Sequence, residues 1–568
     1  MKKKAMSVLL SAAVTVTAVA CGSGMAFADE GSDEEVTLTA FVMQSASTES
    51  GIWQGWGAQK LYDDLKIKID FAPTAEAETS LQQYLVGGDL PDLVGFKGLD
   101  PGELAMDADM LLPLDEYQDQ LPNIFTNDTY ADAIQYSEDN TSNGTGHLYL
   151  MPTSIGPTGY NSYNWIPLLQ WDAYKQAGSP EVSTLEDYLD VVEKMVEVKP
   201  TTETGDKVYG FSLFSDWDTV SASQVATLSF MYGIDTEYVS GLMETNVETK
   251  EINSLLDDNS FYKRALKFYY EANQRGLLDP DSMSQTYADV DQKLSAGRTM
   301  FTWFSWMTGT YNSTHQDDDN PDGYASVVAK DMKLYVAPDQ TIGRNWYFSI
   351  AKDCSNLDAA LKLLNWMYDP DVMWYLMNGP QGVTWDYDED GNPTVINEEI
   401  VENNTEPLMP EEIGGGALRD GVYAFNTMGL RGTTIMEDYN NYPLSYYNWD
   451  SWRNRNPSKL KLEVNAYLGD GVTCLADYVE PNGMSAKSTI AVNMIPVPDD
   501  DLQLVITQIG EIVKKYSWQM VYASNEEEFE SIWSQMQSEA KELGLDDVTE
   551  YYTTEWEKAC ELAEKYSG

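Results

Sequence analysis

Hydrophobic and polar positions in the first hundred residues follow two different spacings. Residues 36–42 (VTLTAFV) and 66–71 (KIKIDF) alternate apolar and polar side chains as strands do, and residues 92–96 (DLVGF) form a third short strand pattern. Helical stretches over residues 53–65 and 77–86 lie between them. The order strand, helix, strand, helix, strand predicts right-handed crossovers and a parallel, doubly wound sheet, so the predicted fold class is α/β.

The carboxyl ends of these strands predict where a ligand would bind. Ligands of doubly wound sheets sit beyond the carboxyl ends of the strands. Residues 43–56 and 96–100 follow two of the three strands and are therefore expected at the rim of a site.

Capping residues predict four further helices along the chain. Asparagine or threonine marks the start of a helix, and glycine or proline marks its end. Thr184 predicts the start of one helix, and Gly276 predicts the end of another. Asn356 and Pro370 mark the start and end of a third helix, and Asn525 and Gly544 those of a fourth.

The composition is that of a globular protein with a strongly acidic balance. The 568 residues exceed what one hydrophobic core holds, so two or more lobes are expected. The chain carries 92 acidic and 35 basic residues, a formal net charge of −57. Such a field repels polyanions, which argues against nucleic acid, anionic lipid and acidic polysaccharides as partners. A neutral ligand would be indifferent to it.

The N-terminus is expected to be a targeting segment. A basic MKKK precedes an uncharged stretch that is too short to span a membrane comfortably. Residues 18–21 (AVAC) resemble a lipobox, in which Cys21 is lipidated after removal of a signal peptide over residues 1–20, whereas residues 26–28 (AFA) offer an ordinary cleavage site. We favour lipidation, which leaves an anchor linker over residues 21–35. The mature chain is then expected outside the cell, where it touches the membrane only through its lipid.

The sequence shows no arrangement for metal or nucleophile chemistry. Cys354, Cys474 and Cys560 are widely spaced, and neither histidine has a Cys or His neighbour at ligand spacing, so no metal, cofactor or His-based triad is predicted. Residues 386–392 (DYDEDGN) resemble the start of a calcium loop, but Asn397 stands where a bidentate Glu is needed, so a hairpin turn is expected. The many carboxylates leave open a pair for glycoside hydrolysis.

The aromatic residues are more informative than the charges. Sixteen Trp and 36 Tyr against 15 Phe mean that most rings carry a hydrogen-bonding group. Residues 300–309 (MFTWFSWMTG) place four rings within six residues, directly after a polar KLSAGR. Alternation along a strand would send Phe301 and Trp303 to one side and Phe304 to the other. The pattern alone leaves open whether these rings pack in a core or face outward.

Eight segments of the chain together follow the pattern of one family. They are residues 87–96 (GGDLPDLVGF), 147–156 (HLYLMPTSIG), 170–195, 206–212 (DKVYGFS), 293–307 (KLSAGRTMFTWFSWM), 347–371, 379–393 and 526–556. In these segments the chain resembles the extracellular solute-binding lipoproteins of ABC importers, in the carbohydrate-binding group that includes maltose-binding protein. Within that group it is most similar to the long lipoproteins of Gram-positive bacteria.

The resemblance implies a two-lobed periplasmic-binding-protein-like fold (class II) with a ligand cleft between lobes joined by hinge strands. The N-terminal lobe would take residues 36–152 with 333–375, and the C-terminal lobe 153–332 with 376–568. The chain would be a monomer and no enzyme: it captures its solute by hinge closure and passes it to membrane permease subunits served by a separate ATPase. Some alginate-binding relatives carry a calcium loop where residues 201–207 here read TTETGDK, so no calcium site is carried over.

A neutral oligosaccharide is the expected ligand. The apolar face of a sugar ring can lie on an indole ring, while its hydroxyls need directed donors and acceptors. The candidate rings for the cleft are Trp303, Trp306, Trp53, Trp56, Trp165, Trp217, Trp346 and Trp385. Lys97 is a candidate donor to a sugar hydroxyl. Two alternatives stay open, a secreted carbohydrate-active hydrolase and a surface glycan adhesin or sensor on the same fold.

Overall fold

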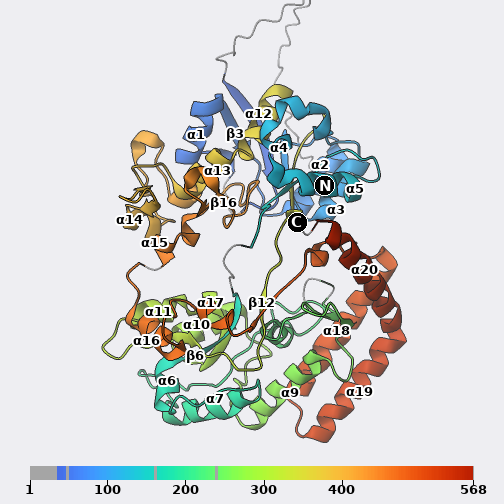
Figure 1. The fold of residues 1–568 in the computed structure, drawn as a ribbon. Helices are drawn as coiled ribbons and strands as arrows, with labels where there is room; N and C mark the ends of the chain where they lie inside the picture. The colour runs from blue at the N-terminus through green and yellow to red at the C-terminus, as the bar shows by residue number, and fades with distance from the viewer. Residues whose placement is uncertain are drawn as a thin grey trace, which may run out of the picture. The chain divides into compact units, whose positions relative to one another are not determined.

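The computed structural model describes residues 35–45, 50–158, 163–236, 239, 241–453 and 455–566, and Figure 1 shows their arrangement. The expected targeting segment, with Cys21 and both cleavage sites, lies outside the described residues. Within the described ranges, no helix combines the length and the apolar character needed to cross a bilayer.

A six-stranded mixed sheet forms the centre of the first lobe. Its strand order is β2-β3-β1-β4-β13-β5. β1 (Val36–Val42) pairs in parallel with β3 (Ile67–Phe71) and with β4 (Leu93–Lys97), so the predicted parallel core is confirmed. The remaining strands are antiparallel to their neighbours: β2 (Gly51–Ile52), β13 (Arg344–Ile350) and β5 (Met151–Thr153).

Helices pack on both faces of this sheet. Leu38 and Ala40 of β1 belong to one buried cluster, while Phe41 and Met43 belong to another on the opposite face. Both faces of the carboxyl half of β1 are therefore buried, which explains why VTLTAFV is wholly apolar from Ala40 onward. The helices concerned are α1 (Trp56–Leu65), α12 (Leu357–Met367) and α13 (Pro370–Asn378) with the first cluster, and α2 (Ala77–Gly87) and α3 (Leu99–Asp107) with the second.

The second lobe has its own, larger core. A three-stranded sheet in the order β10-β6-β11 lies among helices from both the middle and the end of the chain. Its principal elements are β6 (Trp165–Gln170), β8 (Met243–Asn246), β10 (Phe301–Phe304), β11 (Tyr324–Ser326), α7 (Asp187–Val198), α9 (Phe261–Gln274), α10 (Tyr287–Ser295), α11 (Gly309–His315), α18 (Asp500–Val521), α19 (Glu526–Leu543) and α20 (Leu545–Tyr566).

Most of the predicted helix ends are confirmed. Asn356 and Asn525 accept hydrogen bonds from the first turns of α12 and α19, and Gly544 ends α19 in the left-handed region. Gly276 also has a positive φ just after α9. The prediction for Thr184 is wrong: α7 begins at Asp187, whose carboxylate accepts hydrogen bonds from the backbone N–H groups of residues 183 and 184.

Two segments, residues 154–158 and 336–344, run beside each other where the chain passes between the two cores; we call them the crossing segments. Gly156 and Gln340 exchange backbone hydrogen bonds of 3.1 and 3.0 Å. Residues 428–431 run along the first of them, since the Arg431 N–H donates to the Ile155 carbonyl at 2.9 Å. These segments give the two-lobed fold its hinge strands.

Residues 376–452 pack differently from the predicted division, which places them in the C-terminal lobe. Their buried side chains join the cluster of the first sheet. The reason is a stack of rings. The centre of the Trp374 ring lies 3.8 Å from that of Tyr439 and 5.3 Å from that of Trp449. The Trp385 ring packs edge-on against Trp374, with the ring centres 5.4 Å apart. These long-range contacts fix the segment to α13.

Neither the cysteines nor the acidic turn forms a disulfide or a metal-binding group among the described residues. Cys354, Cys474 and Cys560 are free thiols, and no group of His, Cys, Asp or Glu in the described part of the chain is arranged to hold a metal ion. Residues 388–392 form the turn between β14 (Trp385–Tyr387) and β15 (Pro393–Val395), so the predicted hairpin is confirmed.

Candidate functional site

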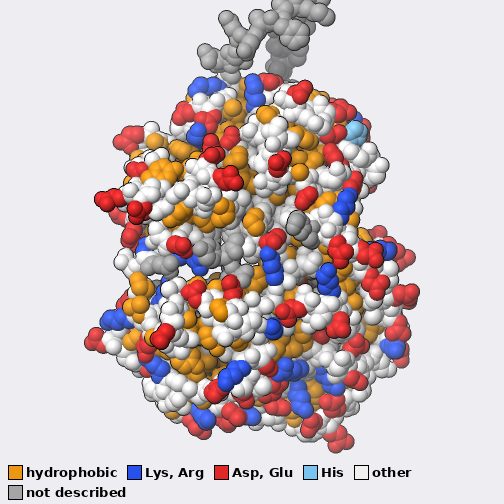
Figure 2. Space-filling view, viewed as in Figure 1, with side chains coloured by type: hydrophobic (Ala, Val, Ile, Leu, Met, Phe, Trp, Pro, Cys, Tyr) orange, Lys and Arg blue, Asp and Glu red, His pale blue; other side chains and the backbone are white. Residues whose placement is uncertain are grey.

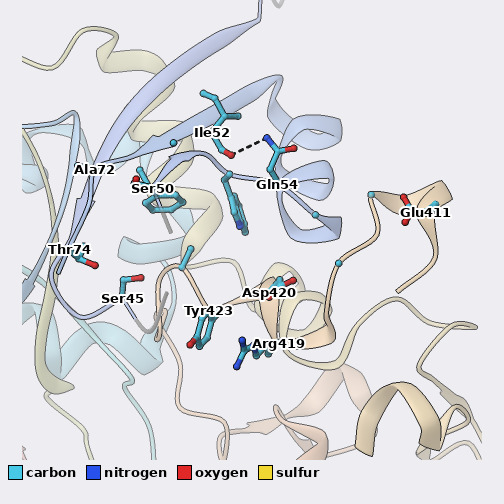
Figure 3. Close-up of a pocket in the computed structure, with 17 residues that line it drawn as sticks. Ser45, Ser50, Ile52, Gln54, Ala72, Thr74, Glu411, Arg419, Asp420 and Tyr423 are labelled. Carbon is cyan, nitrogen blue, oxygen red and sulfur yellow. Dashed lines mark hydrogen bonds between the residues drawn. The ribbon is translucent and has the colours of Figure 1, made fainter. Parts of the chain in front are cut away.

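A pocket of about 500 Å³ lies at the carboxyl ends of β1 and β3 (Figure 3). Residues 50–55, which follow β1, line it together with Ala72 and Thr74, which follow β3. Side chains from residues 411–424 complete the lining. The predicted rim loop after β1 is therefore at the edge of a pocket, where ligands of doubly wound sheets bind.

Trp53 is held in the wall of this pocket. Its ring meets Phe71 edge-on at 6.2 Å and Phe425 at 5.3 Å, and its backbone N–H donates to the Ile69 carbonyl at 2.8 Å. The ring is only half-buried, so part of it stays open to the pocket. Trp53 therefore remains a candidate ligand contact.

Residues 411–424 reach the pocket because their glycines allow a close approach to α1. Gly414 has a φ of +113°, and a Cβ there would lie 2.9 Å from the backbone of Gly55. The Trp56 indole N–H donates to the Ala417 carbonyl at 2.9 Å, which ties the segment to the start of α1. This segment is not among the site regions predicted from the sequence. The run of three glycines at residues 414–416 was the signal that could have found it.

The pocket combines rings with polar groups. The Arg419 guanidinium lies 4.3 Å from the centre of the Tyr423 ring, and Figure 3 shows these two side chains side by side. Asp420 accepts a hydrogen bond from the Ala417 N–H at 2.7 Å, and Glu411 also lines the pocket. Donors and acceptors beside rings suit a ligand that has both an apolar face and hydroxyl groups.

A second group of rings lies in the other lobe, at the end of β10 and the start of α10. We call Trp217, Tyr287, Phe304 and Trp306 the aromatic platform. Trp217 stacks on Tyr287 at 4.8 Å with the planes 11° apart, and Trp306 lies 4.7 Å from Phe304. Trp217 and Trp306 are 43% and 47% exposed. Burial raises the pKa of Tyr287, and nearby Asp291 raises it further, while a hydrogen bond with Trp306 lowers it.

Three predicted site residues are core residues instead. Trp56, Trp303 and Trp385 are 0%, 2% and 3% exposed. Trp385 donates to the Gly379 carbonyl at 3.0 Å, and Trp303 packs among Phe301 and Phe304. Because these rings are almost fully buried, these three predictions are corrected: the rings serve packing. All four residues of β10 are buried, so its alternation does not separate an inner from an outer side.

The remaining candidates are Trp165, which lies in the second lobe, and Trp346 with Lys97, which lie on the first sheet. Trp165 is partly buried and stacks on Phe230 at 4.3 Å. Trp346 pairs across the strands with Lys97, so the structure brings these two predicted residues together at the carboxyl end of β4. Lys97 is exposed and Trp346 is half-buried.

Comparison with known proteins gives a consistent result. Residues 42–374, more than half of the chain, match the family model described as bacterial extracellular solute-binding protein. No curated protein matches the chain.

Solved structures with the same fold cover almost the whole chain. An HMO-binding, ABC-transporter-associated solute-binding protein from Bifidobacterium longum infantis has a TM-score of 0.61 and 16% identity, covering 92% of this chain and 99% of that one. An EF-hand mutant of the S. pneumoniae ABC-transporter substrate-binding protein FusA, in complex with fructo-nystose, has a TM-score of 0.60 and 16% identity, with coverages of 93% and 100%. The N-glycan transport solute-binding protein NgtS of Streptococcus pneumoniae has a TM-score of 0.54 and 13% identity, with coverages of 92% and 99%. At these identities the likeness establishes the fold.

Proposed function

This chain belongs to the bacterial extracellular solute-binding protein family, and we propose that the solute it captures is an oligosaccharide. The family consists of solute-binding proteins rather than enzymes, so the prediction that the chain is not an enzyme is confirmed. The solutes of the similar proteins support the proposal, since these proteins bind HMO, fructo-nystose and N-glycan. We further propose that the chain is anchored through Cys21 and delivers the solute to an ABC permease driven by a separate ATPase.

The observation that carries this proposal is the exposed aromatic platform. Large rings are normally buried, and each exposed ring costs the free energy that its burial would have contributed. Trp217 and Trp306 keep nearly half of their surface in solvent although Tyr287 stacks on the first and Phe304 packs against the second. An exposed indole face matches the C–H face of a sugar ring, and adjacent rings suit adjacent sugar units.

Capture would work by hinge closure. The solute contacts the pocket of the first lobe and the platform of the second, and such contacts exist together only in the closed state. A ligand shifts the open–closed equilibrium by its difference in affinity for the two states. The hydrogen-bonded crossing segments let the lobes turn while each core stays intact.

A glycan screen followed by scattering tests the proposal. We expect at least one oligosaccharide to raise the melting temperature, because it binds the native state alone. The same oligosaccharide should lower the radius of gyration measured by small-angle scattering and remain uncleaved after long incubation. Failure of every glycan in a broad array to bind would refute oligosaccharide capture.

Removing a ring of the platform should weaken binding without unfolding the protein. For Trp217→Ala and for Trp306→Ala we expect affinity for the identified oligosaccharide to fall between about twofold and tenfold, the value of one aromatic contact. Calorimetric titration measures the loss. Tyr387→Ala is the matched control, because Tyr387 is a 40% exposed ring on the β14–β15 hairpin. Equal losses in the control and in the platform variants would contradict the assignment.

A further inference from the structure

Exposure alone does not distinguish the aromatic platform from other apolar surface of this protein. Figure 2 shows apolar side chains in several patches on the face it draws. Large apolar side chains such as those of Met283 and Leu504 are also exposed. Trp217 differs from them in the way its segment, residues 215–223, is held by the rest of the second lobe. We call this segment the platform loop.

Two aspartates flank Trp217 and fasten the platform loop in two directions. Asp216 accepts a hydrogen bond from the backbone N–H of Tyr287 at 2.9 Å. Tyr287 is the first residue of α10 and carries the ring on which Trp217 stacks. Asp218 accepts the indole N–H of Trp518, a buried residue of α18, at 2.7 Å. The loop is therefore joined both to a neighbouring ring of the platform and to a helix near the end of the chain.

Asp218 also closes the platform loop on itself. Its second carboxylate oxygen accepts the Ser223 N–H at 2.8 Å and the Ser223 hydroxyl at 3.3 Å, and its own N–H donates to the Ser215 carbonyl at 3.1 Å. Burial raises the pKa of Asp218, although the donors from Trp518 and Ser223 lower it. Hydrogen bonds to an ionised acceptor are stronger than those between neutral groups. The contacts of Asp218 therefore restrict the loop more than neutral contacts would.

A glycine in the middle of α18 lets this helix approach the platform loop closely. A Cβ placed on Gly510 would lie 2.8 Å from the Cα atom of Val220. Glycine inside a helix is unfavourable relative to alanine, and here the contact with Val220 leaves no room for a side chain. Further along the loop, the Ala222 N–H donates to the Tyr262 hydroxyl at 3.0 Å, and that hydroxyl lies 2.7 Å from the Ser517 hydroxyl of α18. Successive residues of α18 thus support the loop along its length.

We propose that Asp218 is a positioning residue of the sugar site: through its hydrogen bond with the Trp518 indole, it fixes Trp217 in the orientation on which a sugar ring stacks. The helix α18 then takes part in solute capture without touching the solute. Without this hydrogen bond the loop would adopt other arrangements, and ordering it during binding would subtract from the affinity. This inference rests on the proposed function.

Trp518→Phe tests the inference, because phenylalanine keeps a ring at this position but cannot donate to Asp218. The probe is the tightest binder among defined tri- to hexasaccharides of glucose, galactose, fructose and mannose. We expect calorimetric titration to show affinity lowered about two- to fivefold, no more than the loss expected for Trp217→Ala. Trp533→Phe is the matched control, because Trp533 is a buried residue of α19 whose indole N–H donates to Asp258 at 2.8 Å. An equal loss of affinity in this control would overturn the inference.

A double-mutant cycle separates positioning from a general loss of stability. If Trp518 acts through Trp217, adding Trp518→Phe to Trp217→Ala should lower affinity no further. Equal losses from Trp518→Phe in the native and in the Trp217→Ala backgrounds would overturn the inference and leave oligosaccharide capture standing. If Trp217→Ala alone leaves affinity unchanged, the platform is not part of the site and the inference fails with it. If no saccharide binds, both the capture and the inference fail.

Hydrogen exchange measured without solute gives a second readout. Peptides covering residues 215–223 should exchange faster in Trp518→Phe than in the native chain, while peptides from α7 should exchange at the native rate. Gly510→Ala should have the same effect, because its methyl group would press on the backbone of Val220. Native exchange of the platform loop in both variants would overturn the inference without bearing on oligosaccharide capture.

Discussion

Replacing Lys293 by methionine is expected to lower the free energy of unfolding by about 3–5 kcal/mol, as measured by urea denaturation, because it leaves a buried carboxylate without its partner. Asp279 is 0% exposed, and Lys293 donates to it at 2.6 Å and to the Gln285 side chain at 2.7 Å. The Ser212 hydroxyl also donates to Asp279, at 2.8 Å. Methionine fills a similar volume but supplies no charge. The contacts that remain, from the Ser212 hydroxyl and from the Asp281 N–H at 3.2 Å, are neutral and cannot offset the desolvation of Asp279.

Two further variants test this explanation. Lys267→Met removes an exposed ion pair with Glu526 and should cost less than about 1 kcal/mol. Asp279→Asn combined with Lys293→Met removes both charges and should recover part of the lost stability, since an unpaired charge rather than a missing contact is the cause. If the double variant is less stable than Lys293→Met alone, the buried ion pair is not the source of the loss.

The parallel core could be predicted because its signal is local. Alternation in VTLTAFV and KIKIDF, with helical spacing between them, is determined by which faces of neighbouring residues are buried. The antiparallel β13 and β5 could not be ordered in the same way, because strands that join a sheet from distant segments leave no local mark. The same reason explains residues 376–452, whose place follows from Trp374 stacking between Tyr439 and Trp449.

The candidate site could be predicted only in part, because some of its residues are placed by contacts with distant segments of the chain. The loop after β1 is tied to a strand end, so Trp53 could be placed at the rim. Trp56, three residues later, turns inward because Ala417 accepts its indole N–H, and that contact spans 361 residues. Trp303 and Trp306 likewise differ in exposure because β10 ends between them: Trp303 lies within the buried strand, and Trp306 lies in the 3-10 turn that follows it. The chemistry of the rings predicted the class of ligand, but only the structure shows which of the tryptophan rings are exposed to solvent.

The stability of the protein is expected to fall as pH rises from about 4.5 to 7 through the titration of Glu244, a residue of β8 whose buried carboxyl lies against the start of α9. Burial raises the pKa of Glu244 to about 7, although the N–H groups of Phe261 and Tyr262, which donate to it at 2.9 and 2.6 Å, lower it. The folded state then holds a proton that the unfolded chain releases near its ordinary value of 4.5. The free energy of unfolding therefore has its full contribution below that value and loses up to about 3 kcal/mol by pH 7.

Comparison with Glu244→Gln isolates this contribution from the other carboxyl groups. Denaturant unfolding at pH 5, 6, 7 and 8 should show the variant gaining stability relative to the native chain as pH rises, because glutamine cannot ionise. Glu528→Gln provides a control without a pH trend in this range: the Ser524 hydroxyl and N–H lower the pKa of Glu528, so its carboxylate stays ionised from pH 5 to 8 and its contribution to stability is lost only in stronger acid. A difference between the native chain and Glu244→Gln that stays constant from pH 5 to 8 would show that Glu244 remains ionised in the fold, with the helix N–H groups outweighing its burial.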